Sequence, residues 1–260
     1  MDIVIIGSGN VAIVFIRLIS RTNHRLRAVV CRNPDSLSGV TLPTGLLVRD
    51  FGDDIVPADL YIAALSDQFL PELKDHIRLH QGIIVHTAGS VSKEVLKTIL
   101  PRYGVIYPLQ SLRKELDFVP EIPLLVDGSD PLVLDTVRFF AREISEQVTI
   151  AGDEIRSRYH LAAVSSANFI NYLLILVYDY CEKEKLDADM LLPLLKETIN
   201  RLEHVSPAEV QTGPAIRNDS DTISRHLDSL KHYPRLKKLY EHFTELISEQ
   251  FRHKSKDKTD

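Results

Sequence analysis

The chain has 260 residues, of which 44% are hydrophobic and 26% are charged, and its formal net charge is -5. This length can bury one large or two ordinary domains, and the composition is typical of a globular protein. The small negative charge, with no strong basic block before the tail, argues against nucleic acid and against an anionic membrane surface as partners.

The cysteines and the apolar segments predict a soluble cytoplasmic protein. Cys31 and Cys181 lie far apart in the sequence, which fits a reducing compartment, and no cluster of side chains has metal-ligand spacing. The first charge is Asp2, and a glycine turn follows before any long apolar region could form, so we expect no signal peptide. The most apolar later stretch, 173–180, is by itself too short to span a bilayer.

The first 152 residues alternate short apolar runs with helical stretches. Several runs are continuously apolar, which is typical of parallel strands covered on both faces. The pattern predicts an α/β Rossmann-type domain with a mostly parallel, doubly wound sheet. The strand candidates are 2–7, 26–31, 46–50, 58–65, 82–87, 104–109, 122–128 and 146–152, and the helical candidates are 10–21, 69–79, 92–100 and 131–144.

The pattern changes after residue 152, where no convincing strand remains. We expect one long helix over 153–185, followed by helices near 188–204, 220–232 and 234–251. The long helix is too broadly apolar for a surface helix, which favours a core or dimer-interface role. We therefore predict a dinucleotide-binding domain over 1–152, an all-α domain over 153–252 and a disordered tail over 253–260.

The segment "IVIIGSGNVA" joins the first strand to the first helix. Gly7, Gly9 and Ala12 match the dinucleotide fingerprint, in which a tight turn and close backbone approach place a pyrophosphate at a helix N-terminus. The expected cofactor-binding residues of this loop are Gly7, Ser8, Gly9, Asn10 and Val11. A structural turn without a ligand is the alternative.

The end of the second strand candidate indicates which nucleotide would bind. NAD sites usually carry an acid there for the ribose 2′-hydroxyl, but this chain has Cys31-Arg32-Asn33. The planar cation of Arg32 suits a 2′-phosphate, which favours NADP over NAD. A solvated surface charge is the alternative for Arg32.

Loops after later strands should line the same crevice, beyond the carboxyl ends of the sheet. We expect Ser66, Asp67 and Thr87 to contribute to the cofactor site, and Tyr107 to contribute to the substrate site. Ordinary turn and cap chemistry explains each single side chain about equally well.

The blocks "IGSGNVA", "CRN", "HTAGS", "YPLQS", "HLAAVSSANF" and "TGPAIRND" together resemble a family of Rossmann-like NADP oxidoreductases with a helical C-terminal domain of unknown function. This family is similar to pyrroline-5-carboxylate reductases and to the 6-phosphogluconate dehydrogenase superfamily. The resemblance implies NADP as cofactor, a substrate held between the two domains, and a homodimer formed by the helical domain. The substrate loops of those reductases are not matched here, so proline biosynthesis is not supported.

Helical spacing puts His160 and Asn168 on one face of the long helix, with Ser165 beside it. As a histidine, His160 is a candidate to protonate a carbonyl or imine, Asn168 can orient the substrate, and Ser165 can contact it. Arg217 can pair with a carboxylate or phosphate of the substrate. The structural alternatives are a hydrogen-bonded core histidine, an asparagine satisfying a buried carbonyl, and an interface salt bridge.

The sequence therefore predicts an NADP(H)-dependent oxidoreductase that acts on a small carbonyl or imine compound. The alternative is a dinucleotide-binding sensor or regulatory protein without turnover, because the catalytic residues of the related reductases have no obvious replacement. A dehydratase or a deazaflavin-linked reductase is a third possibility. No metal is expected.

Overall fold

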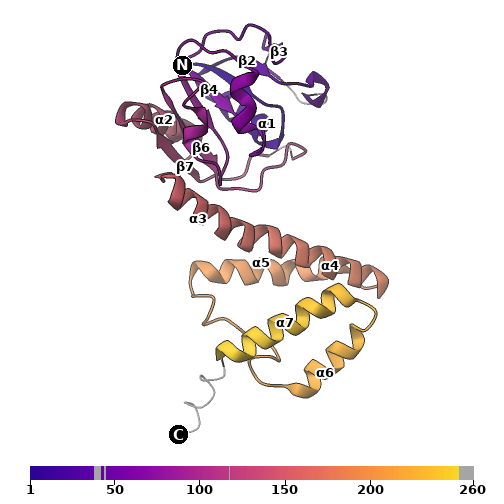
Figure 1. The fold of residues 1–260 in the computed structure, drawn as a ribbon. Coiled ribbons are helices and arrows are strands. Elements are labelled where there is room, and N and C mark those ends of the chain that lie inside the picture. The colour runs from indigo at the N-terminus through magenta and orange to yellow at the C-terminus, as the bar shows by residue number, and fades with distance from the viewer. Residues whose placement is uncertain (38–41, 44, 117, 252–260) are drawn as a thin grey trace. The chain divides into compact units, whose positions relative to one another are not determined.

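A computed structural model of the protein describes residues 1–37, 42–43, 45–116 and 118–251. The chain divides into two compact units, Met1–Ala167 and Asn168–Asp260 (Figure 1). The tail predicted to be disordered, 253–260, lies outside the described residues.

The first unit is built on an eight-stranded sheet with the order β3-β2-β1-β4-β5-β6-β7-β8. Neighbouring strands are parallel except for the antiparallel pair β6 and β7. The order of the first six strands is that of a Rossmann fold, so the predicted fold class is confirmed. The strands are β1 (Asp2–Ile6), β2 (Arg25–Val30), β3 (Leu47–Arg49), β4 (Leu60–Ala63), β5 (Ile83–His86), β6 (Tyr103–Pro108), β7 (Leu124–Gly128) and β8 (Val148–Ile150).

Different elements cover the two faces of the sheet. Alternate strand residues such as Ile3 and Ile5 pack against α1 (Asn10–Ile19) and α2 (Pro131–Ile144). The other face, with Val4 and Ile6, packs against short 3₁₀ turns. Burial of alternate residues on both faces explains why the strand sequences are continuously apolar.

Two of the helices predicted between strands are wrong. The segments predicted as helices over 69–79 and 92–100 form 3₁₀ turns at Leu70–Asp75 and Lys93–Leu96. A 3₁₀ turn rarely extends beyond one turn because its hydrogen-bond geometry is poorer than that of an α-helix. The first turn still buries Leu70 and Leu73 and the second buries Leu96, and this apolar spacing suggested a helix.

The second half of the chain is helical, as expected, and no strand follows β8 within the described residues. The long predicted helix is α3 (Asp153–Ala163), a π-helical turn (Val164–Asn168) and α4 (Phe169–Lys183). Ser165 and Ser166 donate to backbone carbonyls three or four residues earlier, at Leu161 and Ala163, a pattern that favours helix distortion. The remaining helices are α5 (Leu192–Asn200), α6 (Ser220–Ser229) and α7 (Pro234–Phe251).

The continuous helical run Asp153–Lys183 is also long and apolar enough to cross a membrane, with a mean hydropathy of 1.6 over 18 residues. Its apolar length therefore exceeds that of the stretch 173–180 considered from sequence. None of this 18-residue window is buried in the described chain, unlike a typical core helix, but one such helix is by itself weak evidence for a membrane span.

The two units meet within this helical run rather than at the end of the sheet. The boundary predicted at residue 152 follows the last strand, whereas α3 belongs to the same unit as the sheet. In the second unit, α7 contacts both α4 and α6. The domain limits stay a prediction, because the compact units define contacts and not independent folding.

Candidate functional site

The loop between β1 and α1 has the geometry of a phosphate-binding turn. Gly7 has a φ of 125°, and a Cβ built on it would lie 2.2 Å from the Ala64 carbonyl oxygen, so only glycine fits there. Gly9 precedes the first residue of α1, and a Cβ built on it meets no atom of the described residues within 4 Å. The backbone at Gly9 is thus open to a ligand, at a helix N-terminus that favours an anion.

Other segments hold this loop in place. The Ser36 hydroxyl donates to the Ser8 hydroxyl at 2.6 Å, and the Lys114 backbone N–H donates to the Asn10 side chain at 3.2 Å. Val11, the fifth expected residue of the loop, lies partly buried in α1. Arg17 anchors the segment around Lys114 by donating to its carbonyl at 2.8 Å.

Lys114 was missed by sequence reasoning, although its amine donates to the Ser36 carbonyl at 3.2 Å and so lies beside the expected cofactor loop. Lys114 lies in a long connection between two strands and belongs to no recognisable sequence motif. Only the folded structure brings that connection against α1.

Arg32 follows β2 and is exposed, as a 2′-phosphate ligand requires. Its guanidinium carbon lies 4.5 Å from the centre of the Phe69 ring. The preceding Cys31 thiol is buried, and burial raises its pKa. The thiol therefore stays protonated at neutral pH and leaves Arg32 as the charged group at this strand end.

The loops after β4 and β5 meet, as their adjacent strands require. The Ser90 hydroxyl donates to the Asp67 carboxylate at 2.6 Å, and the Thr87 backbone N–H donates to the Ala63 carbonyl at 3.3 Å. Ser66 and Asp67 are exposed, and Thr87 is buried. These three predicted residues therefore lie at one edge of the sheet.

Tyr107 of β6 and His160 of α3 form a hydrogen-bonded pair of proton-carrying side chains at this edge. The phenol oxygen lies 3.0 Å from Nδ1 of His160, and the two rings meet edge to face at a centroid distance of 5.9 Å. Burial, followed by the charge of Asp67, raises the pKa of Tyr107. The phenol is therefore protonated at neutral pH and can donate a proton.

Gly89 makes this pairing possible, and its contacts with the two rings were not predicted from the sequence. A Cβ on Gly89 would lie 2.6 Å from Nδ1 of His160 and 2.9 Å from Cζ of Tyr107. The glycine of "HTAGS" is thus explained by the close approach of the imidazole and the phenol to the backbone.

His86, at the end of β5, is fully buried and accepts a hydrogen bond from the Ala88 backbone N–H at 3.2 Å. Burial, with the nearby positive charge of Arg156, lowers the pKa of His86 to about 4. The imidazole is therefore neutral at physiological pH. Its role is to fix the loop that carries Thr87 and Gly89.

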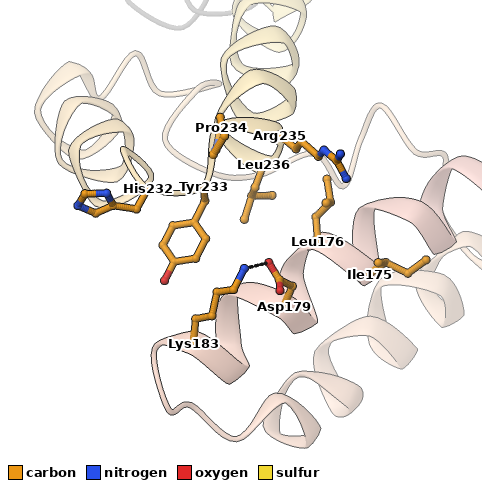
Figure 2. Close-up of a pocket in the computed structure, with 9 residues that line it drawn as sticks. All are labelled: Ile175, Leu176, Asp179, Lys183, His232, Tyr233, Pro234, Arg235 and Leu236. Carbon is orange, nitrogen blue, oxygen red and sulfur yellow. Dashed lines mark hydrogen bonds and ion pairs between the residues drawn. The ribbon is translucent and has the colours of Figure 1, made fainter.

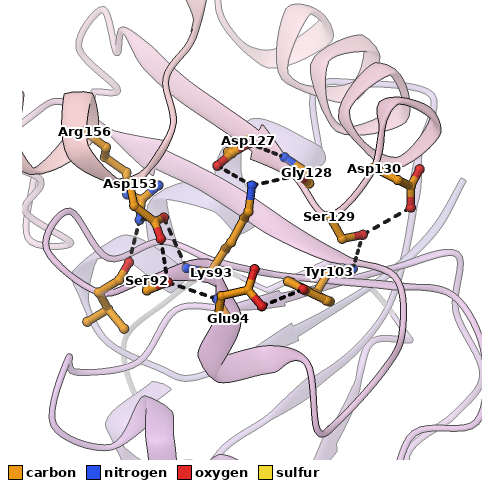
Figure 3. A network of polar contacts seen from close by, with 11 residues as sticks. Ser92, Lys93, Glu94, Tyr103, Asp127, Gly128, Ser129, Asp130, Asp153 and Arg156 are labelled. Carbon is orange, nitrogen blue, oxygen red and sulfur yellow. Dashed lines mark hydrogen bonds and ion pairs between the residues drawn. The ribbon is translucent and has the colours of Figure 1, made fainter.

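A polar network anchors the start of α3 on the sheet (Figure 3). Arg156 is 1% exposed, and one of its nitrogens donates to the Val91 carbonyl and to Asp153 at 2.7 Å. Burial alone would raise the pKa of Asp153, but hydrogen bonds from Ser92 and Arg156 outweigh it and lower the pKa. The network fixes the position of α3 and therefore the position of His160.

A second part of this network joins β7 to the loop after β5. Lys93 donates to the Asp127 carboxylate at 2.8 Å and to the Gly128 carbonyl at 3.0 Å. Figure 3 shows Lys93 lying between these two acceptors and the pair Asp153 and Arg156. The loop after β5 is thereby held both to the sheet and to α3.

The remaining predicted residues are spread over both units. Ser165 lies in the π-helical turn of the first unit and is exposed. Asn168 and Arg217 belong to the second unit and are also exposed. Hydrogen bonds from Thr222 lower the pKa of Asp219, which caps α6, and the charge of Arg217 adds to this lowering. Their contribution to a common site with His160 stays a prediction.

The second unit has a pocket of about 430 Å³ between α4 and the start of α7 (Figure 2). Its Lys183 and Asp179 already form an ion pair at 2.7 Å, and both are about half exposed. Because these charges satisfy each other, the pocket indicates no ligand of a definite class.

Comparison with known proteins relates the chain to dinucleotide-dependent enzymes. A domain family described as a domain of unknown function, DUF2520, matches residues 122–247. The structure of a putative NADP oxidoreductase from Bacteroides fragilis is 32% identical, with a TM-score of 0.86, and the match covers 95% of this chain and 98% of that one. No curated protein matches the sequence significantly.

More distant structures share the fold. A 1-pyrroline-5-carboxylate reductase from Streptococcus pyogenes is 14% identical with a TM-score of 0.59, and the match covers 96% of this chain and 98% of that one. A reductive aminase from Aspergillus terreus, solved with NADPH and ethyl-5-oxohexanoate, is 12% identical with a TM-score of 0.61, covering 99% and 94% of the two chains. Given the near full-length match to the Bacteroides fragilis protein, the chain belongs to the Rossmann-type family of putative NADP oxidoreductases with this C-terminal domain.

Proposed function

We propose that this protein is an NADP(H)-dependent oxidoreductase that transfers a hydride to or from a small carbonyl or imine compound. The observation that carries the proposal is the hydrogen-bonded pair of Tyr107 and His160 at the same sheet edge as the expected cofactor loops.

The phosphate loop fits a dinucleotide. No atom of the described residues lies within 4 Å of a Cβ on Gly9, which leaves room for close approach of a pyrophosphate, and the N-terminus of α1 supplies backbone N–H groups and positive potential. Arg32 would pair with the 2′-phosphate, and Ser66, Asp67 and Thr87 would lie along the nicotinamide half. The cofactor, when bound, supplies or accepts the hydride.

The protein's own contribution is the proton. Tyr107, like any phenol, is protonated at neutral pH, and its burial raises its pKa further; His160 is hydrogen-bonded to the phenol oxygen. The phenol can donate its proton to the substrate oxygen or nitrogen, and the imidazole can then return a proton to the phenol. Asn168, Ser165 and Arg217 are the proposed substrate-orienting groups.

The second unit supports a homodimer. Within residues 168–251 only Cys181, Ala215, Leu230 and Phe251 are buried, which is too little core for a stable helical domain. Large apolar side chains remain exposed along α4 and α5, including Phe169, Ile175 and Ile199. A second copy is the proposed cover, because Asn168 and Asn171 and the charged ends of the helical run suit a protein partner better than lipid.

Light scattering tests the dimer. We expect a mass of twice 29.4 kDa for the native chain. The substitution Ile175→Lys places a charge on the exposed apolar side of α4 and should shift the mass toward one chain, whereas Lys238→Glu on exposed α7 should not. A single-chain mass for the native protein contradicts the proposal.

Fluorescence titration with NADPH and NADH tests the enzyme proposal, followed by a panel of carbonyl and imine compounds with NADPH consumption as the readout. We expect preferential NADPH binding and turnover that falls in Tyr107→Phe. Binding without consumption of any compound favours the sensor alternative, and no binding of either nucleotide contradicts the proposal.

A further inference from the structure

Arg32 is held in place by an aromatic side chain and by no polar group of the described chain. Its guanidinium carbon lies 4.5 Å from the centre of the Phe69 ring, and among the described residues Arg32 makes no hydrogen bond or ion pair. A guanidinium that lies on a ring face keeps its N–H groups free, because these donate in the plane of the cation.

The Phe69 ring is itself fixed. Phe69 is 9% exposed, and its backbone N–H donates to the Ser66 carbonyl at 2.9 Å. The ring stacks with Phe51 at a centroid distance of 5.7 Å and with His76 at 5.1 Å. Phe69 therefore offers Arg32 a rigid surface just beyond the carboxyl ends of β2 and β4.

Rigidity matters because a free arginine side chain loses conformational entropy when it engages a phosphate. An aromatic surface that restricts Arg32 beforehand reduces that loss, which strengthens binding without adding a contact to the ligand. The benefit applies only to a nucleotide that carries a 2′-phosphate, since a 2′-hydroxyl offers no anion to the cation.

We propose that Phe69 is a positioning residue that sets the preference for NADP over NAD by holding the Arg32 guanidinium for the 2′-phosphate. This inference rests on the proposed function, because it requires that the loops of the first unit bind the cofactor. Phe69 lies in the "LSDQF" segment, two residues after Asp67.

The test is fluorescence titration of the full chain with NADPH and with NADH. In Phe69→Leu we expect the ratio of the NADH Kd to the NADPH Kd to fall roughly two- to five-fold, as befits an exposed cation–π contact, with the NADH Kd unchanged. The conservative variant Phe69→Tyr keeps a ring and should keep the native ratio. Phe51→Leu removes a ring that stacks on Phe69 but leaves the Arg32–Phe69 contact in place, so it should lower the ratio less than Phe69→Leu.

A double variant identifies the route. If Phe69 acts through Arg32, adding Phe69→Leu to Arg32→Ala should leave the ratio of the NADH Kd to the NADPH Kd the same as in Arg32→Ala alone. An unchanged ratio in Phe69→Leu, or an equal fall in Phe51→Leu, overturns the inference while leaving the proposed function intact. If the native chain binds neither nucleotide, the proposed function fails and the inference fails with it.

Discussion

The phenol oxygen of Tyr107 and Nδ1 of His160 lie 3.0 Å apart, although 53 positions separate the two residues in the sequence. The pair joins strand β6 to α3, the helix that follows the last strand of the sheet. Gly89 has no side chain, which permits the two rings to approach each other. In the proposed reaction these two groups act together, so their substitution effects should not add.

We therefore expect Tyr107→Phe and His160→Ala each to lower turnover about 100-fold or more, the scale of a lost general acid. The double variant should be little worse than either single variant, because the two groups serve one proton. NADPH affinity should stay native in all three. Independent, multiplying losses in the double variant would contradict a shared proton route.

The two glycines of the phosphate loop should respond to alanine in opposite ways. Gly7→Ala meets the Ala64 carbonyl at 2.2 Å and a positive φ, so we expect it to cost roughly 2–4 kcal/mol of unfolding free energy. Gly9→Ala meets no atom within 4 Å in the part of the chain that the structure describes, and should keep native stability within about 0.5 kcal/mol. It should weaken NADPH binding about tenfold or more, because a methyl group occupies the approach of the pyrophosphate.

Urea denaturation and NADPH titration of both variants check this contrast. Native affinity in Gly9→Ala would show that the loop is only a turn.

His86 should make the protein less stable in acid. Its pKa is lowered from 6.5 to about 4 on folding, so the unfolded chain binds the proton first as the pH falls. Above pH 6.5 the imidazole is neutral in both states and leaves the free energy of unfolding unchanged. Between pH 6.5 and 4 that free energy falls, because the unfolded chain takes up the proton more readily. At pH 5 the loss from this group is about 2 kcal/mol relative to pH 7.5.

The measurement is the free energy of unfolding at pH 7.5 and at pH 5 for the native chain and for His86→Gln. The difference between the two pH values should be smaller in the variant by about 2 kcal/mol. The exposed His232→Gln should leave that difference as it is in the native chain. Equal pH dependence in the native chain and in His86→Gln contradicts the assignment.

Arg156 should be needed for stability. Removing its buried guanidinium in Arg156→Leu breaks the bonds to Val91 and Asp153, and we expect a cost of about 3 kcal/mol. Arg158 forms an exposed ion pair with Glu154 one turn away, so Arg158→Leu should cost at most about 0.5 kcal/mol. Chemical denaturation distinguishes the two, and similar costs would mean that the network does not anchor α3.

The strands were predictable because burial on both faces leaves continuous apolar sequence, as in β1 and β5. The reversed direction of β7 was not predicted, but the sequence held a signal for it. A parallel neighbour requires a crossover element, and the segment 109–123 between β6 and β7 has no predicted helix. The 3₁₀ turns were predicted as helices because one buried turn has the same apolar spacing as a short helix.

The candidate site was predictable where it follows a local rule. The phosphate loop was predicted after the first strand and Arg32 after the second strand. In the structure they follow β1 and β2 in this way. The contacts of Gly89, Lys114 and Phe69 were missed because each depends on a residue from a distant segment. No single-sequence pattern records that His160 reaches Gly89 or that Phe69 lies under Arg32.

The anchoring of α3 has a consequence for how related sequences can differ in length. Asp153 is tied to Ser92 and Lys93, while His160, seven residues on, meets Tyr107. At 1.5 Å and 100° per residue, this interval sets both the reach and the angle of the imidazole. Insertions and deletions should therefore be absent between positions 153 and 160 in relatives that keep the histidine, whereas the helix-free connection after β6 can vary in length.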